Sequence, residues 1–419
     1  MSVFKNLFSD NKVFLKNSYF LYLSHFADYF LLLFFLPFIA KNIGAEEFGK
    51  ISLSQTFGVF IVLIFEFGSP LFLTREVAVS RKSRLKLDLL LIKSLVMKFY
   101  ILPICIILTM ISVHYVPIFK ENPFFIYLVF LGSFAQGITP AWYFAGQEKM
   151  KIIGLSKIIC RVIGFIFIIT FVRDPNDGWI VLAGYTLTSC LICAYLFYES
   201  LKDIKTLKLP SFQEIKVLLS ESSNSFLITF FPVIYQTLSM ILLSIFVNPI
   251  QLGLFYGANR IYRALNSLYS PIGQAFFPKI AFNNLVDSTL AKGLIKNFTA
   301  FFLVFGTLMF TSLFLFSKQI ISILLGVQFH DASIVLILFG SVLPLTALSH
   351  VLGRQWMMAT NQDSIFMKIQ FLSSSFSFIV FILMINKYGI ISIPISLISY
   401  ELSSIFLIII YLFNKNTHE

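Results

Sequence analysis

The sequence predicts an all-α polytopic membrane protein, with about twelve transmembrane helices in two six-helix lobes around a central cationic cavity. Three observations point to this class. Of the 419 residues, 58% are hydrophobic and only 12% are charged, and the mean hydropathy is +0.86, which is far from the balance of a soluble domain. The apolar residues form about twelve runs near the ~20 residues that cross ~30 Å of hydrocarbon. A few runs contain basic residues, which indicates a polar interior.

Five segments follow one another along the chain. Residues 1–17 are basic and amphipathic, and the apolar run after them is too long for a removable signal peptide, so we expect it to stay as an anchor. The lysine-rich connection 199–221 is interpreted as a cytoplasmic hinge loop between a first lobe, 18–198, and a second lobe, 222–413, with a cytoplasmic tail at 414–419. The expected spans are 18–40, 51–73, 89–111, 124–144, 155–172, 179–198, 222–247, 252–276, 298–316, 334–353, 364–385 and 390–413.

The distribution of lysine and arginine predicts the orientation. With a cytoplasmic N-terminus, nineteen of the 32 basic residues fall in inner segments, six in outer loops and seven within spans. Positive charge concentrates on the cytoplasmic side of membrane proteins, so both termini are expected inside. Orientation thus accounts for most of the net charge of +12, and no basic tail indicates a nucleic-acid partner.

Two patterns that could indicate other chemistry have simpler interpretations. The four cysteines lie in or at the ends of apolar spans, which predicts packing residues and no disulfide framework. Residues 44–50 have the spacing of a phosphate-binding loop, but Ile51 stands where a Ser or Thr would bind magnesium. We therefore expect no nucleotide, cofactor or metal.

The span 252–276 carries the strongest functional signal, a polar stripe beside Arg260. Spacings of four, three, four and four residues place its members on one helix face: Asn259, Arg263, Asn266, Ser270 and Gln274. A charge at mid-bilayer costs roughly 2.5–3.5 kcal/mol on insertion scales, so a helix with two central arginines must face protein or water. We interpret it as the wall of a cationic cavity, with both arginines, both asparagines and Gln274 as substrate-binding residues.

The other basic residues within the expected spans differ in how deep they lie in the membrane. Lys98 lies on the order of 10–15 Å from its helix ends, which favours a substrate-binding position as well. Lys157, Arg161 and Lys368 lie near inner ends, where long side chains can reach the interface, so a structural interpretation is favoured. Lys93 leaves both interpretations open.

Three carboxylates within spans are candidates for ion coupling: Asp28, Glu66 and Glu401. Asp28 lies beside a stripe that contains Tyr22, which we expect to bind substrate. A carboxylate in a low-dielectric interior tends to hold a proton, whereas a neighbouring arginine would keep it ionised, and the sequence leaves both open. Glu66 and Glu401 could equally be structural, hydrogen-bonded carboxylates. A cationic chamber with aromatic and amide walls favours an anionic substrate with sugar-like hydroxyls.

The segment Gln136–Lys151, with the sequence QGITPAWYFAGQEKMK, resembles a known family, the polysaccharide-biosynthesis flippases. These are the O-antigen translocases of Wzx type, within the superfamily of multidrug, oligosaccharidyl-lipid and polysaccharide exporters. Shorter matches are Asn17–Tyr19, Ile43–Gly49, Glu66–Gly68 and Leu252–Tyr256.

The resemblance implies a transporter, not an enzyme. It implies transfer of an undecaprenyl-pyrophosphate-linked O-antigen or similar unit from the inner to the outer leaflet of a bacterial inner membrane. Our own hypothesis for the mechanism is alternating access coupled to an ion gradient. The sequence leaves open whether the protein acts alone or beside a polymerase and a chain-length regulator. The family's cavity bases would be Arg260, Arg263 and Lys98. Three alternatives stay open: a multidrug or metabolite exporter of the same fold, a flippase for another carrier lipid, and a membrane glycan polymerase or glycosyltransferase. The last usually needs a sizeable outer loop, and the longest expected here, 317–333, has about seventeen residues.

Overall fold

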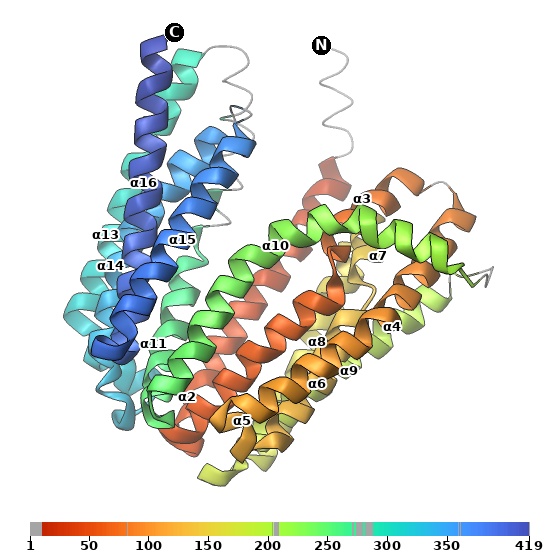
Figure 1. Cartoon of the computed structure of the whole chain (residues 1–419), viewed down its shortest axis with the longest axis horizontal. Helices are drawn as coiled ribbons and strands as arrows, with labels where there is room; N and C mark the ends of the chain where they lie inside the picture. Colours follow the sequence, from red (N-terminus) through yellow and green to blue (C-terminus); the bar gives the residue numbers. More distant parts are fainter. Residues whose placement is uncertain are drawn as a thin grey trace. The chain divides into compact units, whose positions relative to one another are not determined.

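The computed structural model describes residues 11–81, 83–202, 204, 209–269, 272–273, 280, 288–358, 360 and 362–418, and it describes side chains for most of these residues from Phe34 onward. In this part of the chain every regular element is a helix (Figure 1). The elements are α2 (Asn11–Glu66), α3 (Ser69–Ser80), α4 (Arg84–Tyr115), α5 (Pro117–Glu121), α6 (Pro123–Ile138), α7 (Ala141–Gly146), α8 (Met150–Phe171), η1 (Pro175–Asp177), α9 (Gly178–Leu201), α10 (Phe212–Phe246), α11 (Pro249–Asn266), α13 (Ser288–Leu324), η2 (Val327–Phe329), α14 (Ala332–Ser349), the π-helix η3 (His350–Met357), α15 (Asp363–Tyr388), η4 (Gly389–Ile391) and α16 (Ser392–His418).

Each of the twelve expected spans coincides, in whole or in part, with described helix. By length and apolar composition, eight helical stretches of the described chain can cross a membrane. One stretch, Ser364–Asn414, has 51 residues and contains both α15 and α16. Helix α11 is too polar to be among the eight, because its 18 residues include two arginines and two asparagines. The expected all-helical, multi-pass membrane fold is confirmed.

Helix α2 differs from the expectation of a loop at about residues 41–50. It continues from Asn11 to Glu66 with a kink at Gly44, where φ is 76° and ψ is 173°, a conformation that glycine adopts without a Cβ clash. The next expected span, 51–73, is instead interrupted. Phe67 and Gly68 take φ values of 39° and 75° and end α2, and Pro70 then fits the first turn of α3.

Contacts divide the chain into two compact units. Unit 1 comprises residues 1–43 and 50–241, and unit 2 comprises residues 44–49 and 242–419. The short segment 44–49, at the kink of α2, therefore packs with unit 2 although both its neighbours in the chain belong to unit 1. The lobe limits 18–198 and 222–413 stay a prediction.

Small residues allow the helices of unit 1 to pack closely. A Cβ on Gly164 of α8 would lie 1.9 Å from Thr188 Oγ1 of α9, and one on Gly132 of α6 would lie 3.0 Å from Thr186 Oγ1. The Thr186 hydroxyl donates to the carbonyl of Leu128 at 2.8 Å. Close approach through glycine and interhelical hydroxyl bonds are the forces that join helices in lipid.

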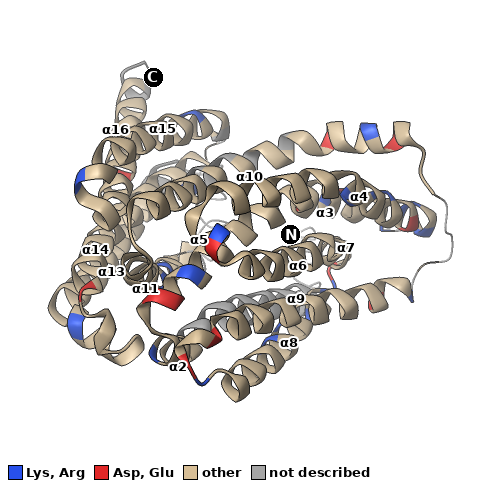
Figure 2. Cartoon of the chain, turned by 60° about the horizontal axis from the view of Figure 1, so that its bottom comes forward, with Lys and Arg blue, Asp and Glu red and all other residues tan. Residues whose placement is uncertain are grey.

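The expected hinge loop 199–221 is helical from Phe212, where α10 begins. The first part of α10 packs in unit 1. Lys93 Nζ lies 2.8 Å from Glu214 Oε1. This ammonium, together with the Ser211 N–H at 2.8 Å, holds the pKa of Glu214 well below its usual range, at about 2. Farther along α10, the ring of Phe226 stacks on Phe67 at 4.5 Å. Figure 2 shows charged residues where α4 and α10 begin.

Unit 2 is built around α14, which packs against α11, α13 and α16. Tyr269 donates its hydroxyl to the carbonyl of Leu343 on α14 at 2.9 Å. Buried serines join α15 to α16, where Ser377 donates to the carbonyl of Ser396 at 2.6 Å. These bonds satisfy polar groups that lipid could not.

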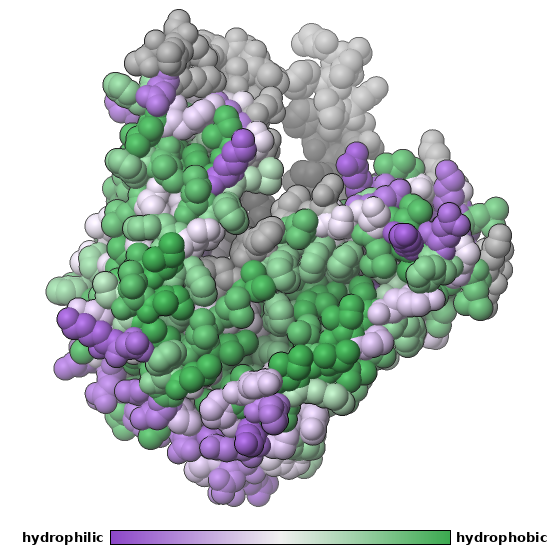
Figure 3. Space-filling model, in the orientation of Figure 1, coloured by the Kyte–Doolittle hydropathy of each residue, from purple (hydrophilic) through white to green (hydrophobic). Residues whose placement is uncertain are grey.

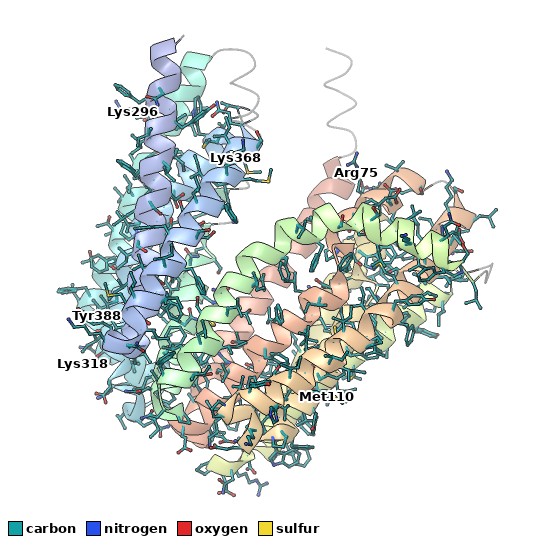
Figure 4. The ribbon with its side chains drawn as sticks, viewed as in Figure 1. Arg75, Met110, Lys296, Lys318, Lys368 and Tyr388 are labelled. Atoms are coloured by element: carbon teal, nitrogen blue, oxygen red, sulfur yellow. The ribbon has the colours of Figure 1, made fainter. Side chains whose placement is uncertain are left out.

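The surface of each unit has a hydrophobic middle between more hydrophilic ends (Figure 3). Large apolar side chains such as Ile107 and Phe376 are exposed, as contact with lipid requires. In unit 2, Lys296 and Lys368 lie toward one end and Lys318 toward the other (Figure 4). Which end is cytoplasmic stays a prediction.

Candidate functional site

Helix α11 carries most of the residues that the polar stripe predicted. Its first turn is closed by a capping box, in which Asn248 Oδ1 accepts the N–H of Gln251 at 2.8 Å and the Gln251 side chain accepts the N–H of Asn248 at 3.4 Å. Pro249 occupies the first helical position, where its missing N–H costs nothing. Residues 248–251 therefore fix where α11 begins, and with it the direction in which the polar stripe faces.

The segment 44–49 fixes α11 from one side. A Cβ on Gly253 would lie 1.8 Å from the carbonyl oxygen of Ala45, and one on Gly49 would lie 2.2 Å from that of Pro249, so only glycine permits this backbone approach. The approach brings the Phe48 ring to 4.7 Å from the Arg260 guanidinium carbon. A cation over a ring face at this distance is attracted to it.

The stripe residues differ in exposure. Asn259 is 5% exposed, Arg260 and Asn266 are half-buried, and Arg263 is exposed. The Oδ1 atom of Asn266 is buried and accepts no hydrogen bond from the residues that the structure describes. A buried acceptor of this kind can be satisfied by a ligand hydroxyl or amide. Gln274 lies outside the described residues, as do the side chains of Tyr22 and Asp28.

Glu401 lies on α16 and is 7% exposed. Thr346 Oγ1 of α14 donates to its Oε1 at 2.8 Å, and Ser349 donates to its Oε2. On the same helix α14, the ring of Phe339 stacks on the Tyr262 ring of α11 at 4.9 Å. Helix α14 therefore contacts both a predicted coupling acid and the helix of the predicted substrate-binding stripe, inside unit 2.

Glu66 and Lys98 lie in the same part of unit 1. Lys98 is 1% exposed, and its charge and that of Lys157 act on the Glu66 carboxylate. Glu66 is the last residue of α2, directly before the break at Phe67. One predicted substrate base and one predicted coupling acid thus lie near enough for their charges to interact, with Lys98 buried and Glu66 half-buried.

Sequence reasoning did not identify Tyr262, Thr346, Ser349 or Phe48. A signal for Tyr262 was available, because it lies three residues after Asn259 and four before Asn266, on the stripe itself. The other three come from distant segments and carried no local signal. Among the described residues, no group of three or more His, Cys, Asp or Glu side chains could hold a metal ion.

Comparisons with known proteins identify a family and two relatives of this chain. Residues 14–283 match the model of a family described as polysaccharide biosynthesis protein. A protein of Escherichia coli (strain K12), assigned as an O-antigen transporter, is 26% identical over 349 residues, which are 82% of this chain and 83% of that protein. A protein of Shigella dysenteriae with the same assignment is 26% identical over 320 residues, 75% of this chain and 78% of that protein.

Two solved structures have a similar fold. The lipid II flippase MurJ, in an inward closed conformation, aligns with a TM-score of 0.68 at 17% identity, over 94% of this chain and 87% of that one. An inward-facing multidrug resistance transporter of the MATE family aligns with a TM-score of 0.65 at 13% identity, over 94% of each. At these identities the likeness concerns the fold alone.

Proposed function

Since the chain belongs to the polysaccharide biosynthesis protein family, we propose that it is a flippase for lipid-linked glycans. Its substrate is an undecaprenyl-pyrophosphate-linked O-antigen or similar repeat unit, moved from the cytoplasmic to the periplasmic leaflet of a bacterial inner membrane. Relatives assigned as O-antigen transporters support this substrate class. The observation that carries the proposal is that helix α11 carries two arginines in a chain whose described residues form eight apolar helical stretches long enough to cross a membrane.

Charge and hydrogen bonding assign the substrate contacts. Arg260 and Arg263 attract the pyrophosphate, because a guanidinium matches phosphate oxygens with paired N–H donors. Asn259 and Asn266 suit sugar hydroxyls, and the unpartnered oxygen of Asn266 is such an acceptor. The remaining members of the proposed set are Gln274, Lys98 and Tyr22.

Transport follows alternating access in this proposal. A cationic cavity opens inward, takes up the head group while the lipid tail stays in the bilayer, and then opens outward. Ion binding at Asp28, Glu66 or Glu401 biases the cycle. The buried, hydroxyl-bonded Glu401 supports a coupling role, because a carboxylate in this setting can exist in two protonation states. A polymerase and a chain-length regulator are the expected partner proteins.

A deletion strain tests the proposal. Lipid-linked glycans are measured by mass spectrometry and surface glycan by staining, in the deletion strain and with the gene restored. We expect single-unit carrier lipid to accumulate and the surface to be bare only in the deletion. Single units that still reach the surface would indicate a polymerase, and no change in either pool would indicate a drug or metabolite exporter.

A variant pair then tests the site. The double variant Arg260→Ala with Arg263→Ala, at normal expression, should restore little surface glycan. Lys318→Ala removes a basic side chain at one end of unit 2 and serves as the matched control, with full restoration expected. Full restoration by the arginine double variant would contradict the assigned substrate contacts.

A further inference from the structure

Two of the helical stretches that can cross the membrane are broken before they end. The stretch Phe34–Ser80 is broken at 67–68, where α2 gives way to α3. The stretch Pro123–Gly146 is broken at 139–140, where α6 gives way to α7. Each stretch therefore ends in a shorter helix, and these two helices, α3 and α7, pack against each other inside unit 1 (Figure 1).

The contact between α3 and α7 is close and is tied at its end. A Cβ on Gly146 of α7 would lie 2.5 Å from Val77 Cγ1 and 2.7 Å from the carbonyl oxygen of Thr74, both on α3. Arg81, directly after α3, donates from Nε to the Gly146 carbonyl at 2.6 Å, and its Nη1 lies 2.8 Å from Glu148 Oε1. One guanidinium thus joins α3 to the end of α7 through a hydrogen bond and an ion pair.

Strained backbone lies on both sides of the joined helices. Among the described residues, Phe67 and Glu148 are the two residues other than glycine with positive φ, at 39° and 60°. This conformation is uncommon for a residue with a side chain, and it persists where the surrounding structure imposes it. Phe67 precedes α3 and Glu148 follows α7, so the pair of helices lies between two strained turns.

Contacts with α10 impose the conformation at Phe67. The Phe67 ring stacks on Phe226 with the centroids 4.5 Å apart. A Cβ on Gly68 would lie 2.6 Å from the carbonyl oxygen of Ser222, so only glycine permits this approach. Gly68 has a φ of 75°, which glycine adopts without strain. Helix α10 therefore holds a break that Phe67 by itself disfavours.

Pro70 opposes the alternative, in which α2 and α3 join into one straight helix. In a continuous helix the proline ring would clash with the carbonyl of Glu66 and would offer it no N–H. In the broken form Pro70 lies in the first turn of α3, where the missing N–H costs nothing. Strain at Phe67 favours the straight form and Pro70 favours the broken form, so a small change can shift the balance between them.

The second break also has a proline and a satisfied helix end. Thr139 precedes Pro140 and has a ψ of 126°, as a residue before proline prefers. Its hydroxyl donates to the carbonyl of Ala135 at 2.6 Å. This carbonyl at the end of α6 therefore has a partner that does not depend on the direction of α7.

We propose that α3 and α7 form one gate at the predicted cytoplasmic end of unit 1, which turns at 67–68 and 139–140 and is joined into one body by Arg81. When α3 moves toward the straight form, the tie at Gly146 carries α7 with it. The consequence for transport, which is control of access from the cytoplasm, rests on the proposed function. The joint movement can be measured without substrate.

Fluorine NMR of the full-length protein in detergent micelles tests the joint movement, with 5-fluorotryptophan at the three native tryptophans. Trp142 on α7 reports the movement, and Trp179 on α9 is the internal reference. Pro70→Ala removes the clash in the straight form, and we expect it to raise the population of a second Trp142 signal by about tenfold. Pro117→Ala, at the first position of α5, is the matched control and should leave Trp142 unchanged.

The tie is tested by the same change in an Arg81→Ala background. There α3 moves without α7, so Pro70→Ala should change the Trp142 populations by no more than about twofold. A Trp142 signal that Pro70→Ala leaves unchanged in the parent would overturn the inference. An equal response of Trp142 with and without Arg81 would overturn it as well.

A second pair of variants tests the break if Pro70→Ala does not fold. Phe67→Gly and Phe67→Ala both lose the ring, but only glycine accepts a φ of 39° without strain. Phe67→Gly should therefore melt about 2–4 °C above Phe67→Ala, which reverses their order in an ordinary helix. An equal or higher Tm for Phe67→Ala would show that residue 67 is not strained and would overturn the turning point.

Transport in reconstituted vesicles separates this inference from the proposed function. A Trp142 response that depends on Arg81, in a protein that moves no lipid-linked glycan, would contradict the flippase proposal and support the gate. Transport by Arg81→Ala at the rate of the parent protein would contradict the role of the gate in transport.

Discussion

Gly253→Ala should separate α11 from the segment 44–49. The added Cβ would lie 1.8 Å from the Ala45 carbonyl oxygen and 2.7 Å from its carbon, whereas ordinary contact begins at 3.4 Å. The backbones must therefore part by roughly 1.6 Å, the difference between 3.4 and 1.8 Å. The obstacle is backbone, which cannot rotate away as a flexible side chain can.

The cost follows from this geometry. Overpacking typically costs about 1–3 kcal/mol, and a backbone obstacle places this substitution at about 3 kcal/mol. For a unit of this size each kcal/mol lowers Tm by about 2–4 °C, so we expect a loss of about 6–12 °C. The change also withdraws Phe48 from Arg260, which removes a cation–π contact of about 0.5–2 kcal/mol.

Thermal unfolding in detergent, followed by tryptophan fluorescence, measures the effect. Gly293→Ala is the matched control: Gly293 lies in α13, and a Cβ there would meet nothing within 4 Å. Alanine should stabilise that helix by about 0.5–1 kcal/mol, so the control should melt at or above the parent temperature. Equal Tm values for Gly253→Ala and the parent would refute the reasoning.

Three further predictions concern the other parts of the chain. Lys93→Ala should lower Tm at neutral pH because it breaks the ion pair with Glu214. The pKa of Glu214 is depressed from 4.5 to about 2, so the difference in Tm from the parent should persist above pH 4.5 and shrink as the pH falls toward 2. A difference in Tm that does not depend on pH would contradict the ion pair. Because the charges of Lys98 and Glu66 act on one another, the double variant Lys98→Met with Glu66→Gln should lose less free energy of unfolding than the sum of the two single variants, whereas additive losses would show that the two side chains do not interact. A reporter protein that works only in the cytoplasm should be active when it is fused after His418, because the C-terminus is predicted to lie inside. Activity of a reporter that works only in the periplasm, fused at the same position, would contradict the predicted topology.

The fold could be predicted from the sequence because few backbone structures satisfy all their hydrogen bonds in lipid. Apolar runs near 20 residues must be helical in a bilayer, and the expected spans coincide with helices for that reason. The conformation at Gly44 and Gly68 could not be read in the same way. Hydropathy falls at both a loop and a kink, and only the packing of 44–49 onto α11 and of α10 onto Gly68 decides between them.

The candidate site was predictable only along one helix. Spacing placed Asn259, Arg263 and Asn266 on one face of α11, because that information is local. The hydroxyls of Thr346 and Ser349 that bind Glu401 come from a helix more than fifty residues earlier in the chain. Such a contact is a property of the packed unit, and a single sequence carries no trace of it.

Reconstituted transport tests the central claim most directly. Purified protein is placed in vesicles with a short-chain isoprenyl-pyrophosphate-linked glycan, and the fraction of glycan open to an enzyme outside is followed over time. With the parent protein, we expect the accessible fraction to rise well beyond the share of glycan that starts in the outer leaflet. With the double variant Arg260→Ala and Arg263→Ala, and in protein-free vesicles, we expect the fraction to stay near that starting share. A fraction that stays unchanged with the folded parent protein, with or without an ion gradient, would contradict the proposal that this chain flips lipid-linked glycans.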